Sequence, residues 1–265
     1  MGKIGHGRKA KELSVTDTTD SNSGIIEGRN AVLEALRSGI GIDKVFLAKG
    51  ETDSALGHIA STARASGAVV VEADRRKLDS MSVTQSHQGV IAMASFAEYV
   101  TIDDILDVAR QRGEKPLIVI CDEISDPHNL GAIIRTCEAA GAHGVIIPKR
   151  RSVGLSATVA KASSGAVFHT AIARVTNITA AVRELKKAGV WFFAASPGGD
   201  KIIWDSDFTC ACAFVIGSEG SGLSRLVGEN CDYMVNIPMS GKLSSLNASV
   251  SAALLLFEAV RQRKL

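Results

Sequence analysis

The alternation of apolar and polar positions divides the chain into short strands and amphipathic helices. Residues 1–24 are polar and without periodicity, so we expect a disordered tail there. Residues 25–97 are predicted to form a small α/β unit that opens with a helix over Asn30–Arg37, where apolar residues recur at helical spacing. The elements expected after it are a strand at Lys44–Ala48, a helix at Asp53–Ser66, a strand at Ala68–Glu72, a helix at Asp74–Met81 and a strand at Gly89–Ser95.

A second α/β unit is predicted over residues 116–265, after a charged linker at 98–115 with a helical pattern over Ile102–Arg110. It opens with the apolar run Leu117–Cys121, which is typical of a buried parallel strand. Asp126 and Pro127 then form a helix start, and Gly141 ends that helix. Further strands are expected at Val145–Ile147, Val167–Ala173, Val190–Ala195, Ala213–Ile216 and Met234–Ile237, and further helices at Ala157–Ser164, Ile178–Ala188, Ser221–Leu226 and Asn247–Arg261. This alternation predicts a parallel sheet covered by helices on both faces.

The composition is that of a soluble globular protein of roughly two domains, with 265 residues, 46% hydrophobic and 22% charged. No apolar run reaches the ~18–20 residues of a membrane span and no leader is visible, so we expect a cytoplasmic protein. Five cysteines without a CxxC pair and six scattered histidines predict reduced thiols and no metal. The net charge of +2 is small, but the basic run Lys149–Arg151 suits a polyanion.

Two turns rich in glycine and serine follow apolar strands near the end of the chain. One is Gly217–Gly222 and the other is Met239–Ser245. In open α/β folds, ligands bind at the carboxyl ends of strands, and glycines let the backbone approach them. The sequence therefore predicts a ligand pocket between these two turns.

Three blocks of the second unit carry polar residues in an order that scaffolding does not explain. They read DPHNLGAIIRT at residues 126–136, IGSEGSGL at 216–223, and IPMSG with SSLNASV at 237–241 and 244–250. Together they resemble the three motifs of the SpoU (TrmH) class of RNA ribose 2′-O-methyltransferases in the SPOUT superfamily, over residues 116–263. The first unit, with IEGRNAV at 26–32 and HQGV at 87–90, resembles the substrate-binding domain of the branch that methylates a guanosine of large-subunit rRNA.

The resemblance implies an α/β domain with a deep trefoil knot, S-adenosylmethionine as methyl donor, RNA as substrate and a homodimer with active sites at its interface. Matched to the motifs, the catalytic positions are Asn129, Arg135, Glu219, Ser245 and Asn247. The cofactor-binding positions are Gly217, Ser218, Gly220, Ile237, Met239 and Leu246. Candidate RNA contacts are Arg29, Lys149, Arg150, Arg151 and Lys161.

Several of these residues have plainer interpretations. Arg135 lies six residues after Asn129, about 240° around a helix, and can instead pair with Glu138. A guanidinium stays protonated, so phosphate binding suits Arg135 better than proton removal. Glu219 can cap the following helix, and Ser245 with Asn247 can be plain N-caps. His87 and His128 are interpreted as structural or RNA-surface residues.

The predicted function is methyl transfer to a ribose 2′-hydroxyl of rRNA. The alternatives within the class are a tRNA methyltransferase and a resistance enzyme that methylates another rRNA site. A catalytically silent RNA-binding or ribosome-assembly factor is the alternative from a different class. The small residues at the start of the last helix and the apolar residues after them suit either a dimer interface or a buried core.

Overall fold

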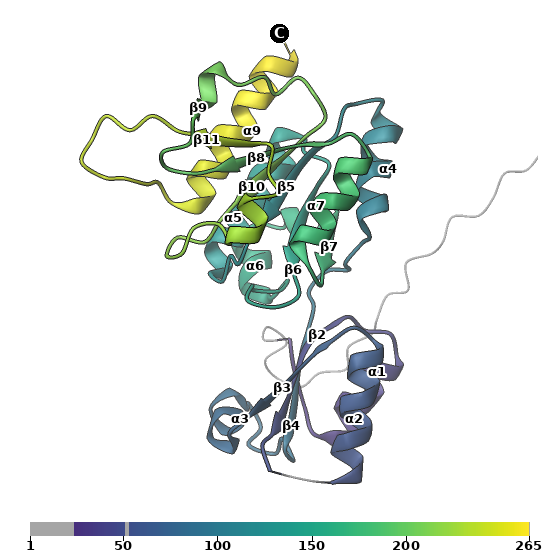
Figure 1. Ribbon diagram of the computed structural model, residues 1–265. Helices are drawn as coiled ribbons and strands as arrows, with labels where there is room; N and C mark the ends of the chain where they lie inside the picture. Colours follow the sequence, from purple (N-terminus) through teal and green to yellow (C-terminus); the bar gives the residue numbers. More distant parts are fainter. Residues whose placement is uncertain (1–23, 51–52, 265) are drawn as a thin grey trace, which may run out of the picture.

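The computed structural model describes residues 24–50 and 53–264 and contains two α/β domains, the smaller drawn below the larger in Figure 1. The predicted tail, apart from Gly24, lies outside the described residues. None of the helices in the described ranges combines the length and apolar character that crossing a membrane requires.

The smaller domain is a four-stranded sheet with helices on both faces. Its strands are β1 (Ile25–Glu27), β2 (Ile42–Ala48), β3 (Val69–Ala73) and β4 (Val90–Ala94), in the order β1-β4-β2-β3. Its helices are α1 (Arg29–Arg37), α2 (Ser54–Ala65) and α3 (Arg75–Met81). Helices α1 and α2 cover one face of the sheet and α3 covers the other (Figure 1). Val32 of α1 and Ile59 of α2 are buried in the core on the first face, and Leu78 of α3 in the core on the second. The sequence missed β1, which has only three residues.

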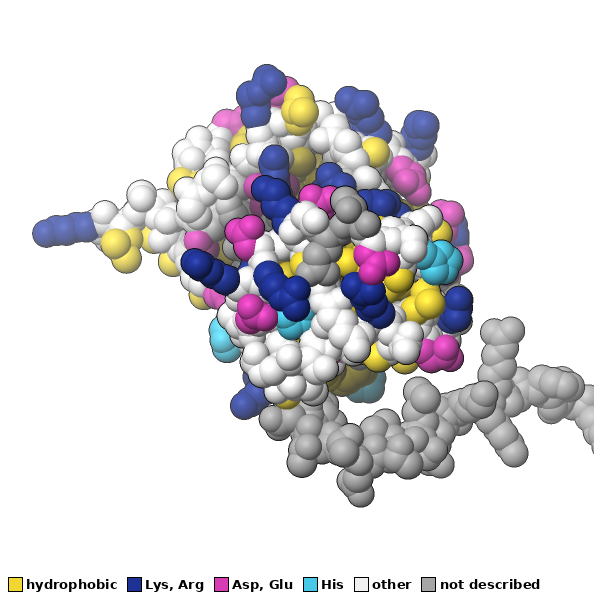
Figure 2. Space-filling model, turned by 90° about the horizontal axis from the view of Figure 1, so that it is seen from below, with side chains coloured by type: hydrophobic (Ala, Val, Ile, Leu, Met, Phe, Trp, Pro, Cys, Tyr) yellow, Lys and Arg dark blue, Asp and Glu magenta, His cyan; other side chains and the backbone are white. Residues whose placement is uncertain are grey.

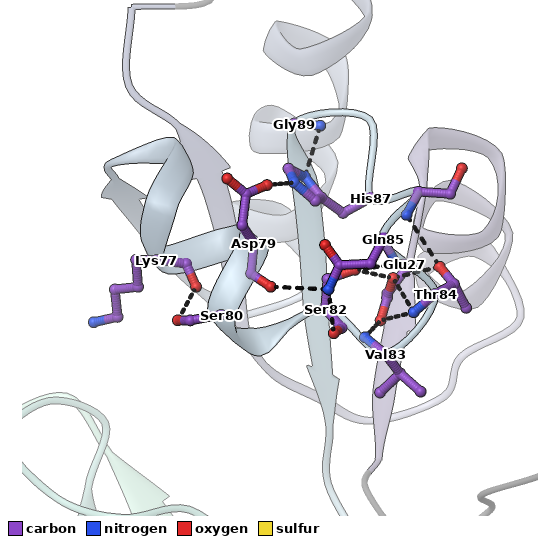
Figure 3. Close-up of polar contacts among 11 residues, drawn as sticks. Glu27, Lys77, Asp79, Ser80, Ser82, Val83, Thr84, Gln85, His87 and Gly89 are labelled. Carbon is purple, nitrogen blue, oxygen red and sulfur yellow. Dashed lines mark hydrogen bonds and ion pairs between the residues drawn. The ribbon is translucent and has the colours of Figure 1, made fainter.

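Glu27, at the end of β1, organises the loop after α3 (Figure 3). Its carboxylate accepts hydrogen bonds from the Ser82 hydroxyl at 2.7 Å, from the Thr84 hydroxyl at 2.6 Å and from the Val83 N–H. Partial burial raises the pKa of Glu27, but the hydrogen bonds from Thr84 and Ser82 outweigh it and lower the pKa overall.

His87 lies buried in the same loop and makes hydrogen bonds within it and to α3. Its side chain is buried, its Nδ1 accepts a hydrogen bond from the Gly89 N–H at 3.1 Å, and its Nε2 lies 2.9 Å from Asp79 Oδ1 (Figure 3). The structural interpretation of His87 is therefore confirmed. The two segments that resemble a substrate-binding domain are also bonded to each other, since the backbone N–H of Arg29 donates to the Gln88 side chain at 3.2 Å.

The larger domain is a seven-stranded sheet in the order β7-β6-β5-β10-β8-β11-β9, parallel throughout. The strands are β5 (Leu117–Cys121), β6 (Gly144–Pro148), β7 (Ile172–Val175), β8 (Trp191–Ala195), β9 (Lys201–Ile202), β10 (Cys212–Ile216) and β11 (Tyr233–Asn236). The helices are α4 (Ile102–Arg112), α5 (Pro127–Ala140), α6 (Ala157–Ala162), α7 (Ile178–Lys187), α8 (Arg225–Gly228) and α9 (Ala248–Lys264), with 3-10 turns η1 (Ala166–Phe168) and η2 (Ile203–Asp205). Helices α5 and α9 pack on one face and α4 and α7 on the other, which confirms the predicted architecture (Figure 1). The knot that the resemblance implies stays a prediction.

Local geometry corrects two expected elements. The strand expected at Val167–Ala173 begins only at Ile172, because the N–H groups of residues 168–170 bond to carbonyls of Gly165 and Ala166 and form η1. The helix expected at Ser221–Leu226 is a turn as far as Ser224, because Ser218 and Gly222 exchange backbone hydrogen bonds at 3.0 and 2.9 Å.

The segment expected to be a linker contains α4, whose buried face, including Ile105, packs on the larger sheet.

The two domains meet at a buried ion pair. Arg174 Nη1 of β7 donates to Asp43 Oδ1 of β2 at 2.7 Å. The Tyr99 hydroxyl donates to the same oxygen at 2.7 Å and accepts a hydrogen bond from the Leu155 N–H at 3.1 Å. A Cβ at Gly154 would lie 2.0 Å from Asp43 Oδ2, so only glycine fits beside the pair. This junction fixes the smaller domain against β7 and the segment before α6.

Candidate active site

A cavity of about 340 Å³ lies at the carboxyl ends of β8, β10 and β11. Its wall comprises the strand ends, the turn 217–222 and the segment that leads into α9. All six predicted cofactor-binding residues line it: Gly217, Ser218, Gly220, Ile237, Met239 and Leu246. The predicted catalytic residues Glu219 and Ser245 also line it. Its volume falls in the range of roughly 300–1,000 Å³ that is usual for small-molecule sites.

The turn 217–222 is shaped by close backbone contacts. A Cβ at Gly217 would lie 2.4 Å from the carbonyl carbon of Gly222, so no other residue fits there without a shift of the backbone. Gly222 adopts a left-handed φ of 68°, and the hydroxyls of Ser218 and Ser221 lie 2.7 Å apart. The turn therefore presents backbone groups and small polar side chains to the cavity.

A second space of about 540 Å³, which we call the hollow, also borders this turn. Residues 218–221 line both spaces. The remaining wall of the hollow comes from the segment after β5, the first turn of α5 and the loop after β6: Glu123, Ile124, Ser125, Asp126, Asn129 and Arg151. A group in the cavity and a group in the hollow would thus meet across one turn.

Asn247 joins the three sequence blocks at this place. Its Nδ2 donates hydrogen bonds to Asn129 Oδ1 at 2.9 Å and to Glu219 Oε1. Its Oδ1 accepts the Ser249 N–H at 2.9 Å at the start of α9. Asn247 is thus both an N-cap and a part of the site. Glu219, in contrast, caps no helix, because α8 begins only at Arg225.

The structure does not bring Arg135 into this group within one chain. It is exposed on α5 and lines neither the cavity nor the hollow. The expected helical geometry, with Arg135 on a different side of α5 from the buried Asn129, holds.

The predicted RNA-binding residues fall into different settings. Arg151 lines the hollow, Arg150 and Lys161 are exposed, and Lys149 reaches the smaller domain, where its Nζ is 3.4 Å from the position of a Cβ on Gly67. Arg29 is tied into the fold by hydrogen bonds to Asp53 Oδ2 at 2.5 Å and to the Gln88 carbonyl at 3.1 Å.

Figure 2 shows the molecule from below, with the smaller domain nearest the viewer. Lys and Arg side chains are spread over this end of the molecule, interleaved with Asp and Glu. The exposed cations that follow β2 and β3 there are Lys49, Arg75, Arg76 and Lys77. The mixture of charges gives this end no uniform potential.

Sequence reasoning missed several residues of the site. Glu123 and Asp126 line the hollow, and Ser196 and Pro197 line the cavity. Buried Asp122 accepts a hydrogen bond from the Ser224 N–H at 2.7 Å and ties the end of β5 to the segment that follows the turn 217–222. A signal was available, because each of these residues closely follows an apolar strand whose carboxyl end faces the site.

The described residues contain no group of three or more His, Cys, Asp or Glu side chains that could hold a metal ion. The site instead gathers amide, hydroxyl and carboxylate groups around two adjoining spaces. Such an arrangement suits a reaction that depends on the alignment of two bound partners.

Comparisons with known proteins agree with this geometry. The model of the SpoU rRNA Methylase family matches residues 116–257, and the model described as RNA 2′-O ribose methyltransferase substrate binding matches residues 25–100. A Bacillus subtilis protein named as a TrmH family tRNA/rRNA methyltransferase is 44% identical over 89% of this chain and 94% of its own length.

Two solved structures resemble the chain in fold and in sequence. The SpoU methyltransferase AviRb of Streptomyces viridochromogenes, in complex with AdoMet, is 27% identical with a TM-score of 0.58, covering 92% of both chains. The TrmH/SpoU tRNA modifying enzyme of A. aeolicus is 29% identical with a TM-score of 0.52, but covers only 60% of this chain and 83% of its own. The chain belongs to the SpoU rRNA methylase family of RNA methyltransferases.

Proposed function

We propose that this protein transfers a methyl group from S-adenosylmethionine to a ribose 2′-hydroxyl of RNA, at a guanosine of large-subunit rRNA. The observation that carries the proposal is the meeting of Asn129, Glu219 and Asn247, from three separate sequence blocks, between two adjoining spaces. One space suits the methyl donor and the other the target nucleotide.

The cavity fits S-adenosylmethionine by shape and by chemistry. Glycine at position 217 lets the turn fold tightly on itself, because a Cβ there would collide with the backbone of Gly222, and the turn in this shape forms one wall of the cavity. Apolar side chains of Ile237, Met239 and Leu246 provide surface for an adenine ring, and the hydroxyls of Ser218 and Ser245 lie in the same wall. We assign Gly217, Ser218, Gly220, Ile237, Met239 and Leu246 to cofactor binding.

The residues between the two spaces orient the ribose hydroxyl. When bound, the cofactor supplies an electrophilic methyl group on a sulfonium sulfur, so the protein has to align donor and hydroxyl and assist loss of one proton. Asn247 fixes the acceptor oxygens of Asn129 and Glu219 by donating a hydrogen bond to each. Ser245 lies on the cofactor side of this group.

Arg135 completes the site from a second copy of the chain in this proposal. Trp204, Val250 and Phe257 are 51%, 45% and 51% exposed and border a space of about 380 Å³ on η2 and α9. An exposed apolar cluster of this kind marks an interaction surface. Helix α9 packs on α5, which carries Arg135, so a homodimer built on this surface places a second α5 near the interface.

Mixing two inactive variants tests the composite site. An equimolar mixture of Arg135→Ala and Asn247→Asp chains, unfolded and refolded together, regains about one quarter of wild-type activity if each site uses residues of both copies. Random pairing gives half heterodimers, each with one intact site. A mixture as inactive as its components would place Arg135 and Asn247 in the same chain's site.

The choice of rRNA rests on the two-domain match. A structure described as an AdoMet-bound rRNA methyltransferase from Sinorhizobium meliloti covers 91% of this chain, whereas the A. aeolicus tRNA modifying enzyme covers 60% of it. tRNA stays the alternative, because the B. subtilis relative carries both substrates in its name. An assay of methyl transfer decides between them. Purified protein is incubated with labelled S-adenosylmethionine and either protein-free large-subunit rRNA or total tRNA, and the label in the RNA is measured. Label in rRNA alone supports the proposal, and label in tRNA alone replaces it with the alternative.

A further inference from the structure

Arg151 and Glu123 face each other at the wall of the hollow in strained backbone conformations. Arg151 Nη1 donates a hydrogen bond to Glu123 Oε1 at 3.0 Å. Both residues are left-handed, with φ of 57° and 60°, a conformation that side chains other than glycine disfavour. Among the described residues only five non-glycine positions have positive φ, and two of them are this pair.

The surroundings hold this strained geometry in place. The Ser152 hydroxyl and the Val153 N–H both donate to the Ile124 carbonyl, at 2.9 and 3.1 Å. The Asp122 N–H donates to the Ile216 carbonyl at 2.8 Å, which links the same segment to β10. The two loops are therefore hydrogen-bonded to each other and to β10 at the residues next to the pair. Strain that the fold keeps in this way is typical of functional sites.

The ion pair itself does not explain the strain. The Arg151 side chain is 79% exposed and that of Glu123 is 31% exposed. Pairs as exposed as this contribute little to stability, since water and salt screen them. The fold therefore gains little from the pair, and Arg151 is free to exchange Glu123 for another anion.

The charge of the hollow indicates which anion that is. Three carboxylates line it, those of Glu123, Asp126 and Glu219, and Arg151 is the one cationic side chain among its described lining residues. An RNA strand that enters a space lined by carboxylates needs a cation for its phosphate. A guanidinium can bind a phosphate through two parallel hydrogen bonds.

We propose that Arg151 is a phosphate clamp that leaves Glu123 to bind the backbone phosphate of the target nucleotide, with Glu123 holding it in position until RNA arrives. The proposal rests on the function proposed above and adds a specific substrate contact to it. Arg151 positions the nucleotide, while Asn129, Glu219 and Asn247 face the reacting ribose.

The test is the salt dependence of RNA binding. Binding of protein-free large-subunit rRNA is measured between 50 and 200 mM KCl for the wild type and for Arg151→Ala. Loss of one phosphate contact weakens binding about tenfold at the lower salt and reduces the slope of log K against log salt by about 0.7–0.9. Arg225→Ala is the matched control, since Arg225 is also 79% exposed and paired, with Glu229 at 2.7 Å, yet lines neither space.

Two further measurements separate a clamp from a structural role. Glu123→Gln frees Arg151 and is expected to tighten RNA binding two- to threefold, whereas Arg151→Ala leaves the Kd for S-adenosylmethionine and the Tm unchanged. An unchanged salt slope for Arg151→Ala, or weaker RNA binding by Glu123→Gln, overturns the clamp. Because binding is measured without methyl transfer, a protein that shows the slope change but methylates no RNA contradicts the proposed function and leaves the clamp in place.

Discussion

The junction between the domains and the mouth of the hollow are each built on one arginine–carboxylate pair, and the two pairs differ in burial. The side chains of Asp43 and Arg174 are 7% and 6% exposed, while those of Glu123 and Arg151 are 31% and 79% exposed. The N···O distances are similar, 2.7 and 3.0 Å. The same chemistry thus joins two domains where water is excluded and leaves an exchangeable contact where water enters.

The surroundings sharpen this contrast. At the junction, Asp43 Oδ1 also accepts the Tyr99 hydroxyl, Arg174 lies over the Tyr99 ring at 5.1 Å, and Gly154 leaves no space beside the carboxylate. At the hollow, the backbones of Glu123 and Arg151 are left-handed and their side chains reach water instead of being packed. We infer that the chain keeps its domains at a fixed relative position and places its adaptable contact at the substrate site.

The largest effect is expected for Arg174→Ala. It leaves the Asp43 carboxylate buried and unpaired, which costs about 3–5 kcal/mol in the free energy of unfolding. Urea unfolding followed by circular dichroism measures it. The double variant Asp43→Leu with Arg174→Met is expected to recover most of the loss, because it removes both charges. If the free energy of unfolding of Arg174→Ala lay within about 1 kcal/mol of the wild-type value, the proposed difference between the buried and the exposed pair would be wrong.

Asn247→Asp separates catalysis from helix capping. Aspartate caps a helix as well as asparagine, so the Tm should change little. The amide donor to Asn129 and Glu219 is lost, and a second carboxylate comes close to Glu219. Methyl transfer is expected to fall about 100-fold, the scale for one oriented donor in an active site. Equal losses of Tm and activity would assign Asn247 to the fold alone.

The junction also predicts the response to alkaline pH. Burial, and then the charge of Asp43, raises the pKa of Tyr99, while burial, and then Arg174, lowers that of Lys44. An unfolded tyrosine ionises near pH 10 and an unfolded lysine near pH 10.4. Above about pH 10.4 the contribution of Lys44 is complete and no longer changes, whereas the contribution of Tyr99, which is complete below about pH 10, falls as the pH rises. Unfolding midpoints measured from pH 9 to 12 should fall less steeply for Tyr99→Phe. Parallel curves would show that Tyr99 ionises as easily in the folded chain.

The smallest effect is expected for Glu123→Ala. Removal of an exposed pair changes the free energy of unfolding by less than about 1 kcal/mol, and its dependence on salt should be weak. The comparison with Arg174→Ala in the same urea experiment is the control. A loss of 3 kcal/mol or more would make the pair at the hollow a structural one.

The sequence predicted those parts of the fold that depend on local pattern. The apolar run Leu117–Cys121 is β5, and Asp126, Pro127 and Gly141 bound α5 as expected. The sequence did not predict the short or irregular elements. Strand β9 has only two residues, and Val167 lies in the 3-10 turn η1, which follows the left-handed Gly165. A pattern of apolar residues does not specify such turns.

The site was predictable as a set of residues but not as an arrangement. Resemblance singled out Asn129, Glu219 and Asn247, yet their hydrogen bonds span up to 118 residues of sequence. The pair of Glu123 and Arg151 depends on two left-handed residues in separate loops, which no spacing reveals. Arg29 was predicted to contact RNA, and the structure adds its hydrogen bonds to Asp53 and Gln88.

The most direct test of the central claim is a map of 2′-O-methylation in rRNA and tRNA from cells with and without this gene. We predict that one methyl of large-subunit rRNA disappears and that the wild-type gene restores it, whereas the gene with Asn247→Asp does not. Identical maps from both cell types, with no S-adenosylmethionine bound by the purified chain, would contradict the account and favour a protein that only binds RNA.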